Sequence, residues 1–344
     1  MITSRKLFLL VSALIILPVI SLRADSVHPE KIVMVWDYIG KKQDNQAPDK
    51  KIVHKGLDVV SPTWFSIKNR NGDVSSFADK GYVQWAHDNA LEIWALFENK
   101  SDTQLTSRVL SSAAARKKMI GQITGFVREY KLDGINIDFE ALSQATGKYF
   151  EQFIIELYKE LKPLKVTLSV DIPFPVSEIQ TIYSISLIAD NSDYVVMMAY
   201  DQHYEGSKAI GPTAAINWVK RGIEETLNYV SHNKIILGIP FYTRVWIEDQ
   251  RSGEVKTSSE LRGMKDAFEM FDGISSIWRR GNITEQIYAE FERDTKRYKV
   301  WLEDDISISL KLDVINDYDL AGMSAWRRGW EWNETWDIIN EHFK

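Results

Sequence analysis

Short apolar segments alternate with longer amphipathic segments from about residue 32 to the end of the chain. Eight of the apolar segments have the length and the residue content that are typical of buried parallel strands. These predicted strands are Ile32–Ile39, Val59–Ile67, Glu92–Phe97, Gly134–Phe139, Val166–Asp171, Tyr194–Ala199, Ile235–Pro240 and Ala321–Trp326. The segments between them have helical periodicity, which is clearest in Ala113–Tyr130, Gly147–Leu161 and Ala214–His232.

This alternation predicts an α/β fold with a parallel sheet, and eight units predict a closed (β/α)8 TIM barrel. The alternative is an open doubly wound sheet, but no G-x-G-x-x-G motif follows an early strand. The interval between the last two strands is too long for one helix, and Gln286–Arg293 and Arg297–Trp301 have the pattern of a hairpin. We therefore predict a small α+β insertion at about 247–303, between strands seven and eight, followed by a helix over Ser307–Tyr318.

The first residues have a different pattern. Arg5 and Lys6 precede the apolar run Leu7–Leu22, which is typical of an export signal. The cleavage site is less clear, so an uncleaved anchor is the alternative, although the run is short for a membrane-spanning helix. We predict a signal peptide or N-terminal anchor over 1–24, a secreted or cell-envelope location, and one barrel domain over 30–344.

Composition excludes several classes of function. The chain has 344 residues, of which 44% are hydrophobic and 26% charged, as in soluble globular proteins. A net charge of −6 supplies no basic surface for nucleic acid or for anionic membranes. The absence of cysteine excludes disulfides and thiolate chemistry, and the six histidines form no metal-binding motif. We expect a monomer without metal or cofactor.

Polar residues occupy the end of the fourth predicted strand, Asp133–Glu140. Alternate side chains of a strand point to opposite faces, so Asn136, Asp138 and Glu140 share a face with Gly134, and the large apolar residues share the other. Burying charge without a partner costs on the order of several kcal/mol, so this row indicates a functional site. The alternative is an edge strand with a solvated polar face, which the small Gly134 disfavours.

Polar and aromatic residues also follow three later strands. Tyr200 and Asp201 end the sixth strand, Tyr242 and Arg244 follow the seventh, and Trp326 ends the eighth. The active site of a (β/α)8 barrel lies at the C-terminal ends of its strands, so these residues are predicted to converge. The alternatives are barrel core for Trp326 and a salt bridge with the insertion for Arg244.

Four of these segments resemble family 18 of the glycoside hydrolases. The fourth strand resembles the D-G-x-D-x-D-x-E motif of that family, with Asn136 in place of an Asp. The M-x-Y-D of strand six, the G-I-P-F-Y-x-R-x-W of strand seven and the closing tryptophan follow in the same order. The Asn136 variant resembles the branch with spore-cortex-lytic enzymes more than secreted chitinases, and Ala95–Glu98 lacks the S-x-G-G of typical chitinases.

The resemblance implies a retaining mechanism in which the 2-acetamido oxygen of the substrate attacks the sugar. Glu140 would be the acid that protonates the leaving oxygen. Asp138 would accept the acetamido N–H, and its charge would favour the protonated form of Glu140. Tyr200 would donate to the acetamido carbonyl, and Trp326 would form the apolar floor under the reacting sugar.

The remaining predicted substrate contacts are Asn136, Asp201, Tyr242, Arg244 and Trp64, and Trp64 is equally consistent with core packing. An amide at position 136 removes one like-charge neighbour from Asp138. We therefore expect Asp138 to be ionised.

These observations predict an exported glycoside hydrolase that cleaves β-1,4 bonds at N-acetylglucosamine, in peptidoglycan. One alternative is a chitinase or endo-N-acetylglucosaminidase acting on other glycans. Another is a non-catalytic chitinase-like lectin, but such lectins commonly lose the acid, and Glu140, Asp138 and Tyr200 are all present. The expected partner is a polysaccharide that contains N-acetylglucosamine, while endo or exo action stays open.

Overall fold

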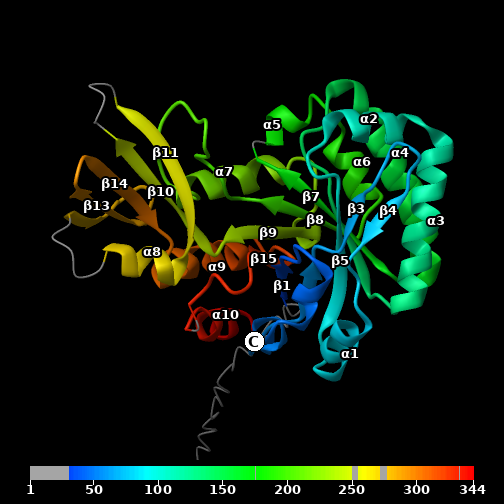
Figure 1. The fold of residues 1–344 in the computed structure, drawn as a ribbon, viewed down its shortest axis with the longest axis horizontal. Coiled ribbons are helices and arrows are strands. Elements are labelled where there is room, and N and C mark those ends of the chain that lie inside the picture. The colour runs from blue at the N-terminus through cyan, green and yellow to red at the C-terminus, as the bar shows by residue number, and fades with distance from the viewer. Residues whose placement is uncertain (1–30, 175, 250–254, 272–276, 333) are drawn as a thin grey trace, which may run out of the picture. The chain divides into compact units, whose positions relative to one another are not determined.

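A computed structural model describes residues 31–174, 176–249, 255–271, 277–332 and 334–344 (Figure 1). The predicted signal peptide or anchor over 1–24 lies outside the described residues. Within the described ranges, no helix has the length and apolar character needed to cross a bilayer.

Eight parallel strands within the described residues close into a barrel, as predicted. They are β1 (Ile32–Asp37), β2 (Val59–Pro62), β5 (Glu92–Glu98), β6 (Gly134–Asp138), β7 (Thr167–Pro173), β8 (Tyr194–Met198), β9 (Ile235–Pro240) and β15 (Gly322–Trp326). Each strand pairs with the next in this series, and the pairing of β15 with β1 completes the ring. All eight therefore direct their C-terminal ends to one end of the barrel.

The second predicted strand is divided in two. The barrel strand β2 ends at Pro62, which has no N–H to donate to a neighbouring strand. The chain resumes as β3 (Phe65–Ile67), which pairs with β5 and with the short β4 (Val74–Ser76). The break turns the side chain of Trp64 under the short 3-10 helix η1 (Lys42–Gln46) instead of across the barrel end.

Helices cover the outside of the barrel (Figure 1). They are α1 (Lys80–Asp88), α2 (Thr103–Ser111), α3 (Ala113–Tyr130), α4 (Gln144–Leu161), α5 (Val176–Ile179), α6 (Ile185–Asp190), α7 (Ile216–Thr226), α9 (Asp305–Asp317) and α10 (Thr335–Phe343). The predicted apolar face of β6 packs outward against α4, where the ring of Phe139 stacks on that of Phe153 with centroids 5.5 Å apart. Asn136 and Asp138 consequently point into the barrel.

The predicted α+β insertion follows β9 (Figure 1, left side of the view). Its antiparallel sheet has the order β11-β10-β14-β13-β12. The elements are β10 (Tyr242–Asp249), β11 (Lys256–Gly263), α8 (Met264–Phe271), β12 (Ile277–Arg280), β13 (Ile287–Arg293) and β14 (Lys296–Leu302). The predicted hairpin is confirmed, because β13 pairs with β14 from Arg293 opposite Lys296. The sheet begins at Tyr242, so the polar residues predicted to follow strand seven lie on its first strand.

Candidate active site at the C-terminal ends of the barrel strands

A pocket of about 320 Å³ opens at the end of the barrel where a (β/α)8 active site is expected. We call it the barrel-end pocket. Two carboxylates, a lysine and a tryptophan are among the side chains that line it: Glu98, Asp138, Lys100 and Trp326. The pocket thus combines an apolar surface with ionisable groups, as a sugar-cleaving site requires.

Asp138 is the last residue of β6 and lies at the floor of this pocket, where part of its surface is open. Its Oδ1 atom has no hydrogen-bond partner within the described residues. Desolvation raises the pKa of Asp138 well above its ordinary value of 3.8, and the charges of Glu140, Asp171 and Glu98 raise it further. Asp138 therefore has one enclosed oxygen without a partner, in a site that opposes its ionisation.

Glu140 lies two residues beyond Asp138 and is exposed to solvent. The buried side chain of Asn99, which follows β5, holds its backbone from both sides. Asn99 Nδ2 donates to Glu140 O at 2.8 Å, and Glu140 N donates to Asn99 Oδ1 at 3.0 Å. The hydroxyl of Ser101 donates to the Glu140 carboxylate at 3.0 Å. The carboxylate is thus free to meet a ligand while its backbone is fixed.

Asn136 is fully buried, and its amide is hydrogen-bonded to the neighbouring strands. Its Nδ2 atom donates to Asp171 Oδ1 at 2.6 Å and to Ser169 Oγ at 2.9 Å, both on β7. Its Oδ1 atom accepts from Trp36 Nε1 at 2.9 Å. The amide is therefore a bridge between β1 and β7, and its closest charged partner is Asp171.

Asp171 opposes the ionised form of Asp138, which was expected from the sequence. Asp171 Oδ2 has no hydrogen-bond partner within the described residues, and burial raises the pKa of Asp171 well above its ordinary value. The hydrogen bond from Asn136 opposes this rise, and the charge of Glu140 adds to it. Position 136 thus lacks the carboxylate of the common family motif, but Asp171 on the neighbouring strand β7 supplies one. The like-charge environment of Asp138 is retained.

Tyr200, Asp201, Tyr242 and Arg244 come together at the same end of the barrel. The ring of Tyr200 packs edge-on against Trp36 and Tyr242, with centroids 6.2 Å apart in both pairs. The exposed Asp201 carboxylate accepts from Tyr242 Oη at 2.7 Å and from Arg244 Nη2 at 3.1 Å. Tyr242 is only 1% exposed and Arg244 7%, so both hold the Asp201 carboxylate from buried positions. This burial argues against the direct sugar contacts predicted for them.

The two predicted tryptophan contacts have different outcomes. Trp326 lines the barrel-end pocket, and its ring lies 6.1 Å from that of Trp36. Trp64 is 1% exposed, and its Nε1 atom donates to Asn45 Oδ1 at 2.7 Å under η1. The sugar contact predicted for Trp64 is therefore wrong, and the alternative of core packing holds.

Three residues of the site were not singled out from the sequence: Glu98, Lys100 and Asp171. The signal for Asp171 was present, because Ser169 and Asp171 alternate with apolar residues in the fifth predicted strand. Burial raises the pKa of Glu98, whereas the nearby charge of Lys100 lowers it. Among the described side chains, no group of three or more histidine, aspartate and glutamate residues is arranged to hold a metal ion.

The variant Asp171→Asn is expected to raise the melting temperature at pH 8 by about 3 °C and to have little effect near pH 4. The raised pKa of Asp171 means that the native state binds more protons than the unfolded state above pH 3.8. The stability from this group is fully present below that pH and is lost as the pH rises through the native pKa. An amide avoids this loss. Thermal unfolding across pH 4–8 measures the difference, and a variant equally destabilised at both ends would contradict the prediction.

The comparisons with known proteins agree with this geometry. The model of the glycosyl hydrolases family 18 matches residues 31–330. The uncharacterized glycosylase YvbX of Bacillus subtilis (strain 168) is 24% identical over 303 residues, which are 85% of this chain and 86% of that protein. The cortical fragment-lytic enzyme of the same strain is 23% identical over 255 residues, which are 72% of this chain but only 58% of that enzyme.

Two solved structures share the fold. The spore cortex-lytic enzyme SleL of Bacillus megaterium QM B1551 has a TM-score of 0.77 at 20% identity, over 91% of this chain and 74% of that chain. The chitinase from Chromobacterium violaceum ATCC 12472 also has a TM-score of 0.77 at 20% identity, over 91% of this chain and 98% of that chain. The chain therefore belongs to family 18 of the glycosyl hydrolases, and it is a glycosidase whose relatives include spore-cortex-lytic enzymes.

Proposed function

We propose that the protein is an exported enzyme that hydrolyses β-1,4 bonds at N-acetylglucosamine in peptidoglycan, with retention and substrate assistance. The observation that carries the proposal is the exposed Glu140 two residues beyond Asp138, a partly buried carboxylate that lines the barrel-end pocket. The names of the cortical fragment-lytic enzyme and of SleL support a wall glycan as substrate. The export pattern over 1–24 agrees with a substrate outside the cell.

Glu140 protonates the leaving oxygen in this proposal. Its carboxyl group reaches solvent, while Asn99 fixes the backbone that carries it. The geometry suits a group that must meet the glycosidic oxygen and then act on a water molecule from the same position. All of these groups come from one chain, so the proposed monomer would have a complete site.

Asp138 accepts the acetamido N–H of the substrate on the part of its carboxylate that faces the barrel-end pocket. Burial opposes a charge on Asp138 in the free enzyme, but the oxazolinium intermediate brings a positive charge beside it. That charge offsets the desolvation cost, so the carboxylate stabilises the intermediate more than the ground state. This difference between the two states is what accelerates the reaction.

Tyr200 donates to the acetamido carbonyl and aligns it for attack. Burial, with the nearby charge of Asp171, raises the pKa of Tyr200 well above its ordinary value of 10.0. The hydroxyl consequently keeps its proton at neutral pH. Trp326 provides the apolar surface under the sugar, since its ring lines the pocket opposite the polar groups.

The proposal is tested by mass spectrometry of products from purified peptidoglycan, spore-cortex fragments and chitin oligomers, with Glu140→Gln as control. We expect wall products that end in reducing N-acetylglucosamine, and NMR of the first product should show the β-anomer. Cleavage of chitin oligomers alone would assign a chitinase. Oligomers that bind without being cut would favour the lectin, and an α-anomer would refute retention.

A further inference from the structure

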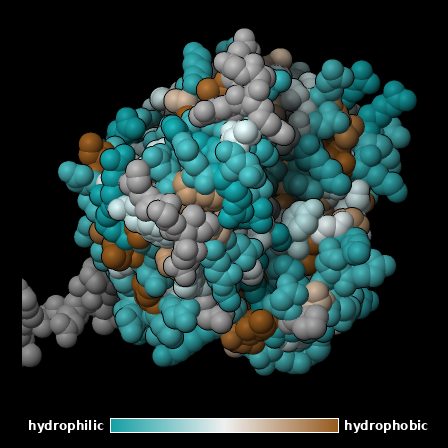
Figure 2. All heavy atoms as spheres, turned by 60° about the vertical axis from the view of Figure 1, so that its left-hand side comes forward, coloured by the Kyte–Doolittle hydropathy of each residue, from teal (hydrophilic) through white to brown (hydrophobic). Residues whose placement is uncertain are grey.

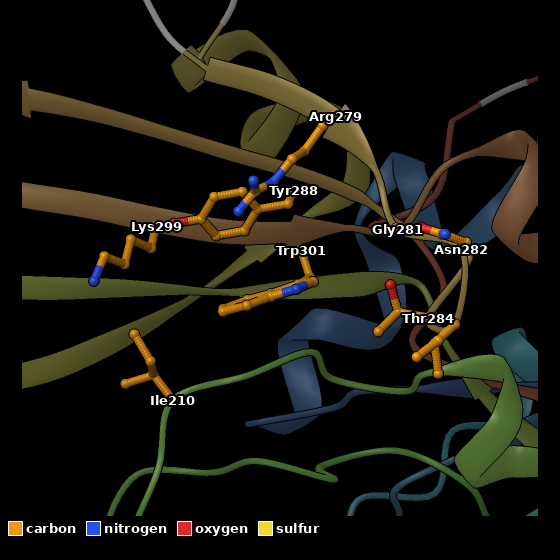
Figure 3. A pocket seen from close by; sticks show the side chains of 9 residues that line it. Ile210, Arg279, Gly281, Asn282, Thr284, Tyr288, Lys299 and Trp301 are labelled. Carbon is orange, nitrogen blue, oxygen red and sulfur yellow. The ribbon is translucent and has the colours of Figure 1, made fainter.

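A second cavity, of about 430 Å³, lies on the insertion sheet and shares no lining residue with the barrel-end pocket (Figure 3). We call it the insertion cavity. Its volume is within the range of small-ligand sites. Aromatic, cationic and amide side chains line it, together with one aliphatic residue from the loop after β8: Trp301, Tyr288, Arg279, Lys299, Asn282 and Ile210.

Two aromatic residues and Arg279 form a row across three neighbouring strands, which we call the aromatic row. Trp301 of β14 is paired with Tyr288 of β13, which is paired with Arg279 of β12. The two rings lie 4.9 Å apart, and the guanidinium carbon of Arg279 lies 5.1 Å from the centre of the Tyr288 ring. In Figure 3 these side chains stand on the same side of the sheet, facing the loop that carries Ile210. The opposite face of the sheet packs on α8.

The loop between β8 and α7 forms the facing wall of the insertion cavity. It is held against β10, because Trp246 Nε1 donates to Gly211 O at 2.8 Å and Arg244 N donates to Thr213 Oγ1 at 3.2 Å. The guanidinium of Arg244, in contrast, is directed to Asp201 and Ser259. The insertion cavity and the catalytic groups therefore share a supporting loop but have separate walls.

Arg279 is the cation of this cavity that is available to a ligand. It is exposed and has no carboxylate within ion-pair distance among the described residues. Lys299, by comparison, pairs with Glu248 at 2.8 Å. The other nearby carboxylate, Glu290, accepts a hydrogen bond from the hydroxyl of Tyr288. Lys299 is thus neutralised by Glu248, whereas the guanidinium of Arg279 is left for an anionic group of a ligand.

This combination matches a sugar that carries a carboxylate. Aromatic rings bind the apolar face of a pyranose, and a guanidinium binds a carboxylate through two parallel hydrogen bonds. Asn282 and Thr284 at the rim supply an amide and a hydroxyl for sugar hydroxyls. The insertion side of the molecule in Figure 2 is mainly hydrophilic, and its hydrophobic residues are scattered, so no broad apolar surface for a protein partner is visible there.

We propose that the insertion cavity is a second glycan-binding site that selects acidic N-acetylated polymers, in which a sugar or its substituent carries a carboxylate. It holds the enzyme on the polymer while the barrel-end pocket cleaves. This inference deepens the proposed function and rests on it for the identity of the polymer. It does not require turnover, so binding and cleavage can be tested separately.

The experiment uses the full chain with Glu140→Gln, so that glycans bind without being cut. Its probes are soluble peptidoglycan fragments and the same fragments after carbodiimide coupling to methylamine, which removes the carboxylate charges. We expect Arg279→Gln to weaken binding of the untreated fragments about tenfold and to leave the amidated fragments unchanged. Trp301→Ala should weaken binding of both about tenfold.

Arg293→Gln is the matched control, because its guanidinium lies 5.3 Å from the centre of the Phe291 ring, which belongs to the α8 side of the sheet. In the active enzyme, Arg279→Gln and Trp301→Ala should leave kcat/KM on a short chitin oligomer within twofold of the parent.

Wild-type binding by both variants would refute the site, and equal loss on both probes with Arg279→Gln would refute the acid selectivity. Binding that depends on Trp301, without any wall cleavage by the active enzyme, would support the site and refute the proposed function. Cleavage of the wall by the active enzyme, with unchanged binding in both variants, would support the proposed function and refute the second site.

Discussion

Glu140→Gln is expected to lower kcat on a β-linked N-acetylglucosamine oligomer by about 10³-fold and to leave binding within about twofold. A glutamine keeps the size of the side chain and its hydrogen bond with Ser101, but it has no proton of suitable acidity for the leaving oxygen. The two hydrogen bonds of the buried Asn99 amide, which we call the Asn99 clamp, are made to the backbone of residue 140 and therefore persist in the variant. Steady-state kinetics and calorimetry with the same oligomer measure the two quantities.

The matched control for this variant is Glu160→Gln, an exposed glutamate on α4 that is remote from the barrel-end pocket. It should have wild-type kinetics. If Glu140→Gln retained full hydrolysis, Glu140 would not be the acid. A loss of binding together with the loss of kcat would instead show that the substitution disturbs the pocket.

Exchanging the residues at positions 136 and 171 is expected to recover most of the activity that either single change removes. Asn136→Asp adds a carboxylate at the 2.6 Å contact with Asp171, and we expect it to lower kcat about 10²-fold because like charges are then buried together. Asp171→Asn removes the charge altogether and should lower kcat about tenfold. The double variant places one charge at position 136, as in the common family motif.

The double variant should therefore return to within about fivefold of the parent, which corresponds to a coupling of about 3 kcal/mol between the two positions. Its pH profile should resemble that of the parent, whereas each single variant should shift. Effects that simply add would mean that the two positions act independently. Ser169→Ala, which removes the other hydrogen-bond acceptor of Asn136 Nδ2, separates loss of a hydrogen bond from loss of charge.

The barrel and the hairpin could be predicted from the sequence because their signals are local. Strands such as Gly134–Asp138 have an apolar face and a polar face in immediate succession, and the insertion hairpin joins two strand patterns by a short turn. The pairing of Asp171 with Asn136 is different, since it depends on the register that sets Asn136 opposite Ser169. A one-residue shift in that register would direct Asp171 elsewhere.

Trp64 and Tyr242 were predicted to contact the substrate but are buried, and the two cases have a related cause. The direction of Trp64 depends on where β2 ends, and Pro62 ends it before the side chain can face the pocket. Tyr242 follows its strand directly and was expected to contact the substrate, but the insertion sheet begins with it and buries it against Asp201. In both cases the path of the backbone beyond the end of the strand decides whether the side chain is exposed. The alternation of polar and apolar residues within the strand does not predict that path.

The Asn99 clamp on the backbone of Glu140 affects the choice of expression host. Asn99, Lys100 and Ser101 form an N-x-S acceptor for N-linked glycans, and Asn99 is 2% exposed with both atoms of its amide already in use. A eukaryotic secretory pathway attaches such glycans to the unfolded chain, before the amide can be buried. Protein made by that route would lose the group that positions Glu140. Recombinant material for every assay above should therefore come from bacterial cells.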